Sequence, residues 1–289
     1  MSRVRSLGAR LTGRHINTAA ERISVVSDKI PMKNRISLVD KGRVCLVKIG
    51  DGKEPVFGID QPEKYIDLDH LKGVFRDGEV LDASVENGCL YLTKGKDAYW
   101  FPLDDYYEMD AKYPELDPET EFRMDPRKLS KAYSKELKGG FARLMADYDE
   151  SGKKIVRAVV YDKNRQPKGS IILAGTWTGS PSRANYPMDY LKDIGRFGND
   201  AEVRMSTDYP MEMIVEGDVP TRYLLAPVVG LVGEDPDGKE CSVGSMNRRR
   251  AARGSRFRMF QKEDNLTVKT GASNLFKNTD ERDGYTRAT

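Results

Sequence analysis

Apolar and polar residues follow a helical period in two short stretches that lie about 120 residues apart. In the second stretch, Leu191, Ile194 and Phe197 fall on one side when successive residues are turned by about 100°. Lys192 and Arg196, four residues apart, fall on the opposite side. The pattern predicts an amphipathic helix with an apolar face toward a core and a basic face away from it.

The first stretch has nearly the same sequence pattern. The run Asp69-His70-Leu71-Lys72 matches Asp189-Tyr190-Leu191-Lys192 at an offset of 120, and Arg76 matches Arg196 at the same offset. Each stretch is followed by alternating apolar and polar residues, "EVLDASV…CLYLTKGKDAYWFPL" or "EVRMSTDYPMEMIVEGDVPTRYLLAP", which predict strands and turns. The chain therefore contains one structural unit twice.

Two further helices are predicted, one in each half. "DPRKLSKAYSKELKG" begins with Asp125 as N-cap and Pro126 at the first helical position, and Gly139 ends it. Its counterpart in the first half is "NTAAERISVVSDK", capped by Asn17 or Thr18. All four helices carry cations opposite the apolar side. They are Arg22, Lys29, Lys72, Arg76, Lys128, Lys131, Lys135, Lys138, Lys192 and Arg196.

The charge of the chain is unevenly distributed. Residues 1–230 hold 36 Lys plus Arg against 36 Asp plus Glu, whereas residues 231–289 hold 12 against 9. The body has no net charge, so any anion-binding surface must come from the separation of charge between faces. A solvated face explains the cations of any single helix, but a shared basic surface explains all four more economically.

Composition divides the chain into four segments. Residues 1–103 and 122–230 are the two repeat domains. Residues 104–121 are rich in proline and acid and predict an extended linker, with a long surface loop as the alternative. Residues 231–289 are polar and basic and are expected to be disordered.

Several classes of protein are excluded by the same reading. No apolar run approaches the roughly 20 residues of a membrane span. The stretch 1–15 lacks the apolar centre of a secretory signal, and we expect a first strand there. The three cysteines and two histidines share no metal-ligand spacing. Because no phosphate loop or nucleophile motif is present, we expect neither an enzyme nor a cofactor.

These residues resemble the PCNA-type DNA sliding clamps of archaea, eukaryotes and some of their viruses. The resemblance is strongest in "YPMDYLKDIGRF" and in "DYPMEMIVEGDVPTRYLLAP" with its final Leu-Ala-Pro. In the first half, "SLVDKGRVCLVKI" and "YIDLDHLKGVF" are similar to the family's strand pair with its central loop and to its second helix. The resemblance covers residues 1–230.

The resemblance implies an α+β clamp fold with two topologically equivalent domains, each with two helices packed on antiparallel sheet. Three chains would close head to tail into a ring around double-stranded DNA, which explains why each chain needs the unit twice. Implied partners are DNA polymerase, a clamp loader and PIP-box proteins such as flap endonuclease and ligase, in DNA replication and repair. The implied location is the cytoplasm or nucleoid for an archaeal or viral source and the nucleus for a eukaryotic one.

The family also captures the peptides of its partners, with a glutamine-x-x-aliphatic-x-x-aromatic-aromatic motif, in a pocket beneath the linker. Carried over by position, the resemblance assigns this pocket to Arg43, Val44, Leu46, Met109, Pro210, Ala226 and Pro227. Without the resemblance, ordinary core or strand packing is the preferred explanation of Val44, Leu46 and Pro210. Val228 stands where the family usually has a basic residue, so polar anchoring of the peptide is expected to differ.

Three further expectations concern departures from the family and alternatives. The chain is short between the first helix and "NRISLVDKGRV", which predicts a trimmed first domain. The tail segment "MNRRRAARGSRFRMFQK" has seven cations and no acid, and it is either an arm that contacts phosphates or a partner, or a solvated tail. The functional alternatives are a monomeric or dimeric processivity factor held on DNA by charge, and an unrecognised nucleic-acid enzyme.

Overall fold

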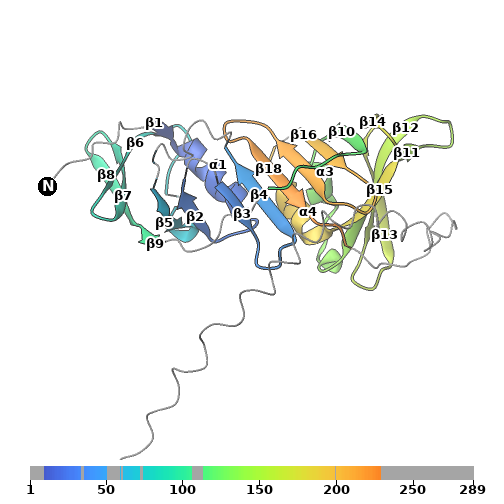
Figure 1. Cartoon of the computed structure of the whole chain (residues 1–289), viewed down its shortest axis with the longest axis horizontal. Coiled ribbons are helices and arrows are strands. Elements are labelled where there is room, and N and C mark those ends of the chain that lie inside the picture. The colour runs from blue at the N-terminus through green and yellow to red at the C-terminus, as the bar shows by residue number, and fades with distance from the viewer. Residues whose placement is uncertain are drawn as a thin grey trace, which may run out of the picture. The chain divides into compact units, whose positions relative to one another are not determined.

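A computed structural model describes residues 10–33, 36–50, 59, 61–71, 74–105, 113–198 and 200–228. All of them belong to one compact unit, Met1–Leu231. The predicted tail, 231–289, lies outside the described residues. Figure 1 shows the elements in order along the chain.

The first half of the unit alternates short strands with two helices. The elements are β1 (Arg10–Thr12), α1 (Gly13–Ile23), β2 (Lys29–Met32), β3 (Ile36–Val39), β4 (Cys45–Ile49), β5 (Gln61–Asp67), α2 (Leu68–Leu71), β6 (Val80–Glu86), β7 (Cys89–Lys94), β8 (Asp97–Pro102) and β9 (Asp104–Asp105). Strands β2 and β3 have four residues each, half the length of their counterparts β11 and β12 below. The first half thus has short strands at β2 and β3, the region where a trimmed domain was predicted.

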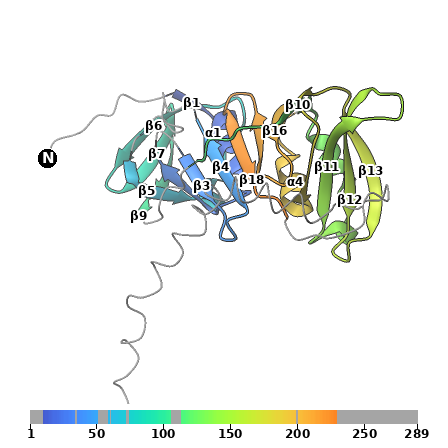
Figure 2. The same cartoon turned by 45° about the vertical axis from the view of Figure 1, so that its right-hand side comes forward.

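The second half repeats this order. The elements are β10 (Thr120–Met124), α3 (Arg127–Ala132), a 3₁₀ turn η1 (Lys135–Leu137), β11 (Phe141–Tyr148), β12 (Lys154–Tyr161), β13 (Pro167–Ala174), β14 (Thr178–Gly179), β15 (Ser182–Pro187), α4 (Met188–Ile194), β16 (Ala201–Met205), β17 (Met211–Val215) and β18 (Thr221–Leu225). Strands β10–β13 are longer than β1–β4, whereas β15–β18 are shorter than β5–β8. Figure 2 shows β11, β12 and β13 next to one another, as their antiparallel pairing requires.

The sheets confirm that one unit occurs twice. The first half forms a sheet in the order β1-β6-β7-β8, and the second half repeats it as β10-β16-β17-β18. In each half a phenylalanine packs against a tyrosine, edge to face in the first half and stacked in the second. Phe75 meets Tyr99 with ring centroids 5.2 Å apart, and Phe197 stacks on Tyr223 at 6.4 Å. The structure therefore has the predicted α+β fold, with helices packed on antiparallel sheets.

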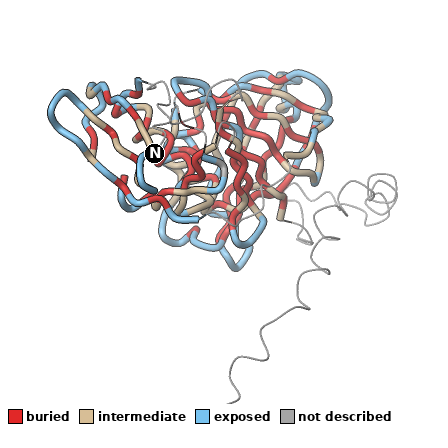
Figure 3. The backbone as a smooth tube through the Cα atoms, turned by 60° about the vertical axis from the view of Figure 1, so that its left-hand side comes forward, coloured by how far each residue is buried: buried red, intermediate tan, exposed pale blue. Residues whose placement is uncertain are grey.

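A single sheet joins the two halves. Strand β18 pairs antiparallel with β4, and Tyr223 lies opposite Val47 in the register. Together with β3 this makes a seven-stranded sheet, β14-β10-β16-β17-β18-β4-β3. Figure 3 shows buried positions running through the strands, with exposed residues mostly in the connecting turns.

Helix α1 begins earlier than the sequence predicted. Its N-cap is Thr12, whose hydroxyl accepts from the His15 N–H at 3.1 Å, so Asn17 and Thr18 lie inside the helix. A β-carbon on Gly13 would come within 2.1 Å of the Arg76 carbonyl oxygen. Only glycine permits this contact, and it fixes the start of α1 against the segment after α2.

Helix α3 ends earlier than predicted. Tyr133 has an extended backbone with ψ of 132°, and the chain continues through η1 to Gly139. The predicted N-terminus is nearly right, because the Asp125 carboxylate accepts from the Arg127 N–H at 3.0 Å. The four lysines of the predicted stripe therefore do not share one continuous helix.

Candidate functional site

Within the predicted basic set, the exposed cations of the second half lie on α3, on η1 and its flank, and directly after α4. Lys131, Lys135 and Lys138 are exposed, and within the described residues their side chains have no hydrogen-bond or ion-pair partner. Arg196 is exposed and lies 3.5 Å from the Asp193 carboxylate. Because α3 packs against α4, these cations belong to one neighbourhood.

Two lysines of the predicted basic set are more constrained. Lys128 donates to the carbonyl oxygens of Ile172 and Leu173 at 3.1 and 3.0 Å, so it ties α3 to β13. Lys192 lies over the Tyr133 ring, 4.7 Å from its centroid, and pairs with Asp193 at 3.4 Å. These two lysines have partners within the protein and are less free to meet a phosphate.

The prediction that Arg22 belongs to an exposed basic helix face is wrong. The Arg22 side chain is only 5 % exposed. The guanidinium donates to the carbonyl oxygens of Val215, Val219 and Glu216 and to the Thr221 hydroxyl. Burial lowers the pKa of Arg22, while Tyr223, Asp218 and Glu21 oppose that shift. Arg22 therefore joins α1 to the second half of the chain and is not part of an exposed basic surface.

Two remaining first-half cations of the predicted set, Lys29 and Arg76, lie outside helices. Lys29 starts β2 and sits over the Tyr65 ring, 4.4 Å from its centroid, so the predicted helix does not reach it. Arg76 is exposed in the segment after α2. Lys72 lies outside the described residues.

The predicted peptide pocket centres on the hairpin of β3 and β4. Its turn is held by Asp40, whose carboxylate accepts from the N–H groups of Gly42, Val44 and Cys45 at 2.7–2.8 Å. The last strand joins it, because the Ala226 N–H donates to the Val44 carbonyl at 2.8 Å. The structure thus brings Val44 and Ala226 together.

The other predicted pocket residues differ in exposure. Arg43 is exposed and has a left-handed backbone with φ of 55°. Pro210 is half-buried, whereas Pro227 and Leu46 are buried, Leu46 to 2 %. Met109 lies outside the described residues.

A polar cluster beside this pocket was missed by sequence reasoning. Leu46 lies opposite Leu224, and Leu224 lies opposite Glu212 in the next strand pair. The Tyr113 hydroxyl, from the predicted linker, donates to Glu212 at 2.8 Å. Burial, and then the Glu212 carboxylate, raise the pKa of Tyr113. Tyr113 therefore holds the linker beside Leu224. No sequence pattern around Tyr113 predicted this contact.

The turn at Asp40 has a second copy that sequence reasoning also missed. "DKGR", Asp40 to Arg43, recurs as "DKNR", Asp162 to Arg165. The Asp162 carboxylate accepts from the N–H groups of Asn164 and Gln166 at 2.8 and 2.9 Å, and Arg165 has φ of 65°. The two turns lie 122 positions apart, whereas the helices match at an offset of 120. A comparison of the two halves that permits a two-residue insertion would have found this second copy.

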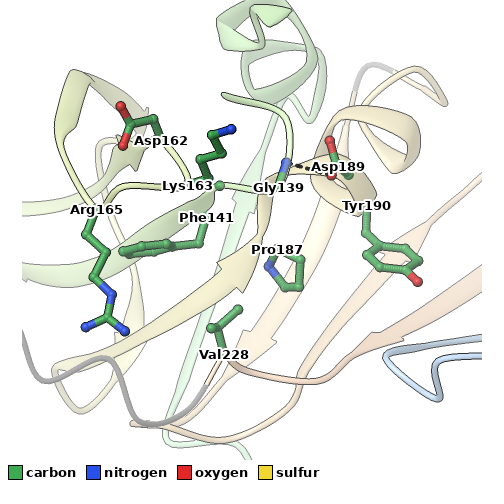
Figure 4. A pocket seen from close by; sticks show the side chains of 10 residues that line it. Gly139, Phe141, Asp162, Lys163, Arg165, Pro187, Asp189, Tyr190 and Val228 are labelled. Atoms are coloured by element: carbon green, nitrogen blue, oxygen red, sulfur yellow. Dashed lines mark hydrogen bonds between the residues drawn. The ribbon is translucent and has the colours of Figure 1, made fainter. Parts of the chain in front are cut away.

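A cleft of about 290 Å³ lies beside this second turn. Figure 4 shows Lys163 and Arg165 on the turn, Pro187 and Val228 across Phe141 from Arg165, and Tyr190 at the far side. The Tyr190 hydroxyl donates to the Asp40 carboxylate at 2.7 Å. The cleft therefore borders the hairpin of the predicted peptide pocket.

Two of the strands at the ends of the described sheets are β8 and β13. Strand β8 is the last strand of β1-β6-β7-β8, and β13 is the last of β13-β12-β11-β15. They carry the most exposed large apolar side chains of the described residues, Trp100 at 65 % and Ile172 at 62 %. Exposed apolar edges of this kind indicate surfaces for pairing with another chain.

Two further features are absent from the residues that the structure describes. They contain no group of three or more His, Cys, Asp or Glu side chains arranged to hold a metal ion. None of their helices is long and apolar enough to cross a membrane.

Comparison with known proteins shows similarity in structure but not in sequence. No protein-family model and no curated protein sequence matches the chain. A. fulgidus PCNA, bound to the C-terminal region of FEN-1, matches with a TM-score of 0.61 at 18% identity, over 77% of this chain and 98% of that one. The PCNA of Entamoeba histolytica matches at 0.60 and 16%, over 76% and 98%. The PCNA2-PCNA3 complex of Sulfolobus tokodaii matches at 0.59 and 13%, over 76% and 99%. The chain therefore has the PCNA-type clamp fold.

Proposed function

We propose that the chain is a DNA sliding clamp, which closes as a homotrimeric ring around duplex DNA and tethers DNA polymerase and other replication and repair proteins. On this proposal the protein is a scaffold without catalytic activity of its own. The observation that carries the proposal is the junction between β18 and β4. The counterparts of these two strands, β8 and β13, each end a sheet, and within the described residues the outer edge of each has no partner strand.

Because the unit occurs twice, the junction between β18 and β4 predicts how two chains pair with each other. Strand β8 occupies in its sheet the place that β18 occupies in the second half, and β13 follows its Asp-Lys-x-Arg turn as β4 follows the first. Because β18 pairs antiparallel with β4 inside the chain, β8 should pair antiparallel with β13 of a neighbouring chain. Head-to-tail pairing of this kind closes into a ring when the rotation per chain divides a full turn.

The register of the internal junction can be transferred to the edges. Tyr99 corresponds to Tyr223 through the aromatic pairs, and Gly169 corresponds to Val47, since both lie opposite the residue two before the turn aspartate. Tyr99 should then face Gly169, and Ala98 should face Ser170. Both Ala98 and Ser170 are exposed.

The cations support DNA passage through the ring. Lys131, Lys135, Lys138 and Arg196 are exposed around α3 and α4 and can meet phosphates without reading bases. The peptide pocket supports tethering, since Val44, Ala226 and Pro210 are partly accessible beside the linker. The A. fulgidus PCNA matched above carries the C-terminal region of FEN-1, which supports a PIP-box partner for this chain.

Cross-linking and sizing test the ring directly. The variant Ala98→Cys with Ser170→Cys should form disulfides between chains under mild oxidation, because paired strand positions match the Cα separation of a disulfide. The single variants should not. Light scattering on a sizing column should give three chains for the unmodified protein. A stable monomer or dimer that still binds DNA would favour the charge-held processivity factor instead.

Retention on DNA tests encirclement. Once loaded, a ring should stay on circular duplex and slide off linear ends. Equal retention on both DNAs would mean that surface charge alone holds the protein.

A further inference from the structure

The cleft beside the second Asp-Lys-x-Arg turn combines an apolar floor with a basic rim. Phe141, Pro187 and Val228 provide the floor. Lys163 and Arg165 line the cleft from the turn and form the rim, and their charged ends point to opposite sides of Phe141 in Figure 4. A β-carbon on Gly140 would come within 2.1 Å of the Tyr161 carbonyl oxygen, so glycine lets β11 start close to β12. A groove of this kind suits an extended peptide.

The two carboxylates that line the cleft are already engaged. Asp162 accepts from backbone N–H groups of its own turn and pairs with Lys168 at 3.2 Å. Asp189 accepts from the Gly139 N–H at 3.0 Å and from the Tyr133 hydroxyl at 3.1 Å. Within the described residues, neither carboxylate forms an ion pair with Lys163 or Arg165.

Lys163 and Arg165 lie on a turn with a fixed backbone, and their side chains are free to bind a ligand. Within the described residues, neither the Lys163 nor the Arg165 side chain has a hydrogen-bond or ion-pair partner. Their turn is fixed, because the Arg165 N–H donates to the Asp162 carbonyl at 3.0 Å and the Asp162 N–H donates to the Gln166 carbonyl at 3.1 Å. A preformed loop loses less entropy when it binds a ligand.

The cleft adjoins the predicted peptide pocket on two sides. Tyr190 lines the cleft and donates to Asp40, which holds the turn of the pocket hairpin. Val228 lines the cleft directly after Ala226 and Pro227 of the pocket. A peptide seated in the pocket can therefore continue into the cleft.

We propose that this cleft binds an acidic segment that flanks the pocket-binding motif of a partner protein. Carboxylates of that segment pair with Lys163 and Arg165, and an apolar side chain rests on Phe141, Pro187 and Val228. The inference deepens the proposed function and rests on it for the presence of a partner peptide. It assigns to the second turn a role in choosing among partners that share the same motif.

Calorimetry on the full chain with two synthetic peptides tests the proposal. Both peptides carry the motif Gln-x-x-Leu-x-x-Phe-Phe, one with a Glu-Glu pair on each side and the other with Gln-Gln pairs. The acid-flanked peptide should bind roughly three- to tenfold more tightly at low salt, as expected for two partly exposed ion pairs, and the preference should shrink as salt rises. The variant Lys163→Gln with Arg165→Gln should abolish the preference.

A matched variant controls for net charge. Lys96→Gln with Lys153→Gln removes two exposed cations from other turns and should keep the preference. A preference that survives in the Lys163/Arg165 variant, or its absence in the unmodified protein, would overturn the proposal. So would a loss of duplex DNA binding in that variant with the peptide preference unchanged, because the cations would then serve DNA.

A second measurement separates this inference from the proposed function. An acidic peptide without the motif is titrated at millimolar concentration while the backbone amide signals of Gly139, Gly140 and Arg165 are followed by NMR. If these signals shift but the motif peptides do not bind, the acidic-segment site in the cleft is supported and the predicted peptide pocket is refuted. Unmoved signals at the cleft would refute the acidic-segment site, whatever the pocket does.

Discussion

Replacing Arg22 tests whether this cation stabilises the fold or contacts DNA. The guanidinium joins α1 to the turn between β17 and β18, almost 200 residues away in sequence, through three carbonyl oxygens and the Thr221 hydroxyl. The Tyr223 hydroxyl returns a hydrogen bond to the Arg22 carbonyl at 3.1 Å. The variant Arg22→Met keeps much of the side-chain volume but removes every donor.

The expected loss can be estimated from the contacts. Each buried acceptor left without a partner costs about 1–3 kcal/mol, and water entering the site recovers part of that sum. Removal of the charged group also ends its own cost of burial. We expect Arg22→Met to lower the free energy of unfolding by about 3 kcal/mol, a large part of the roughly 5–15 kcal/mol of an ordinary domain.

Urea denaturation followed by tryptophan fluorescence and circular dichroism measures the change. Lys131→Met is the matched control, because its side chain is exposed and its loss should leave unfolding unchanged. Arg22→Lys should recover only part of the stability, since one ammonium cannot reach all four acceptors. An Arg22→Met protein of normal stability with weakened DNA binding would refute the structural role and restore the DNA-facing one.

Three further predictions address the edges, the basic surface and the linker. Trp100→Glu should shift the oligomer to smaller species in light scattering with an unchanged circular dichroism spectrum, and an unchanged mass would exclude β8 as an interface. Lys131→Ala with Lys135→Ala should reduce the salt dependence of DNA binding by about one unit or less per lysine, with no change in base preference; an unchanged slope would place these lysines away from DNA. Tyr113→Phe should lower the free energy of unfolding by about 1 kcal/mol in urea titration, because Glu212 keeps ion pairs with Arg204 and Arg222. If Tyr113→Phe lowers the free energy of unfolding by more than about 3 kcal/mol, the Tyr113 hydroxyl stabilises other parts of the fold besides the linker.

The fold was predictable because the repeat fixed its main features. The helical period around Leu191 and the alternating strands after it are local signals, and the structure buries Leu191, Ile194 and the inward residues of β16 and β17. Helix ends were less predictable. Thr12 became the N-cap because Gly13 packs on the Arg76 carbonyl, a contact between residues 63 positions apart that no local pattern contains.

The candidate site was only partly predictable, since exposure depends on tertiary contacts. Helical projection placed Arg22 and Lys131 in one class, yet one is buried beneath the β17–β18 turn and the other is exposed. Lys128 likewise follows the predicted stripe but donates to β13. Periodicity predicts on which side of its own helix a side chain lies. The elements packed around the helix decide whether that side is exposed to solvent or buried.

The two Asp-Lys-x-Arg turns show why the repeat alone does not assign function. Both turns hold an arginine at positive φ, which is costly for a side chain with a β-carbon, and in both the aspartate offsets that cost by accepting two or three backbone N–H groups. The first aspartate then accepts from Tyr190, whereas the second pairs with Lys168. The same local sequence therefore builds the same turn, but its neighbours leave the cations of the second beside an open cleft. That difference arises from the surrounding strands, and only a variant that removes Lys163 and Arg165 without disturbing Asp162 can show whether it has a function.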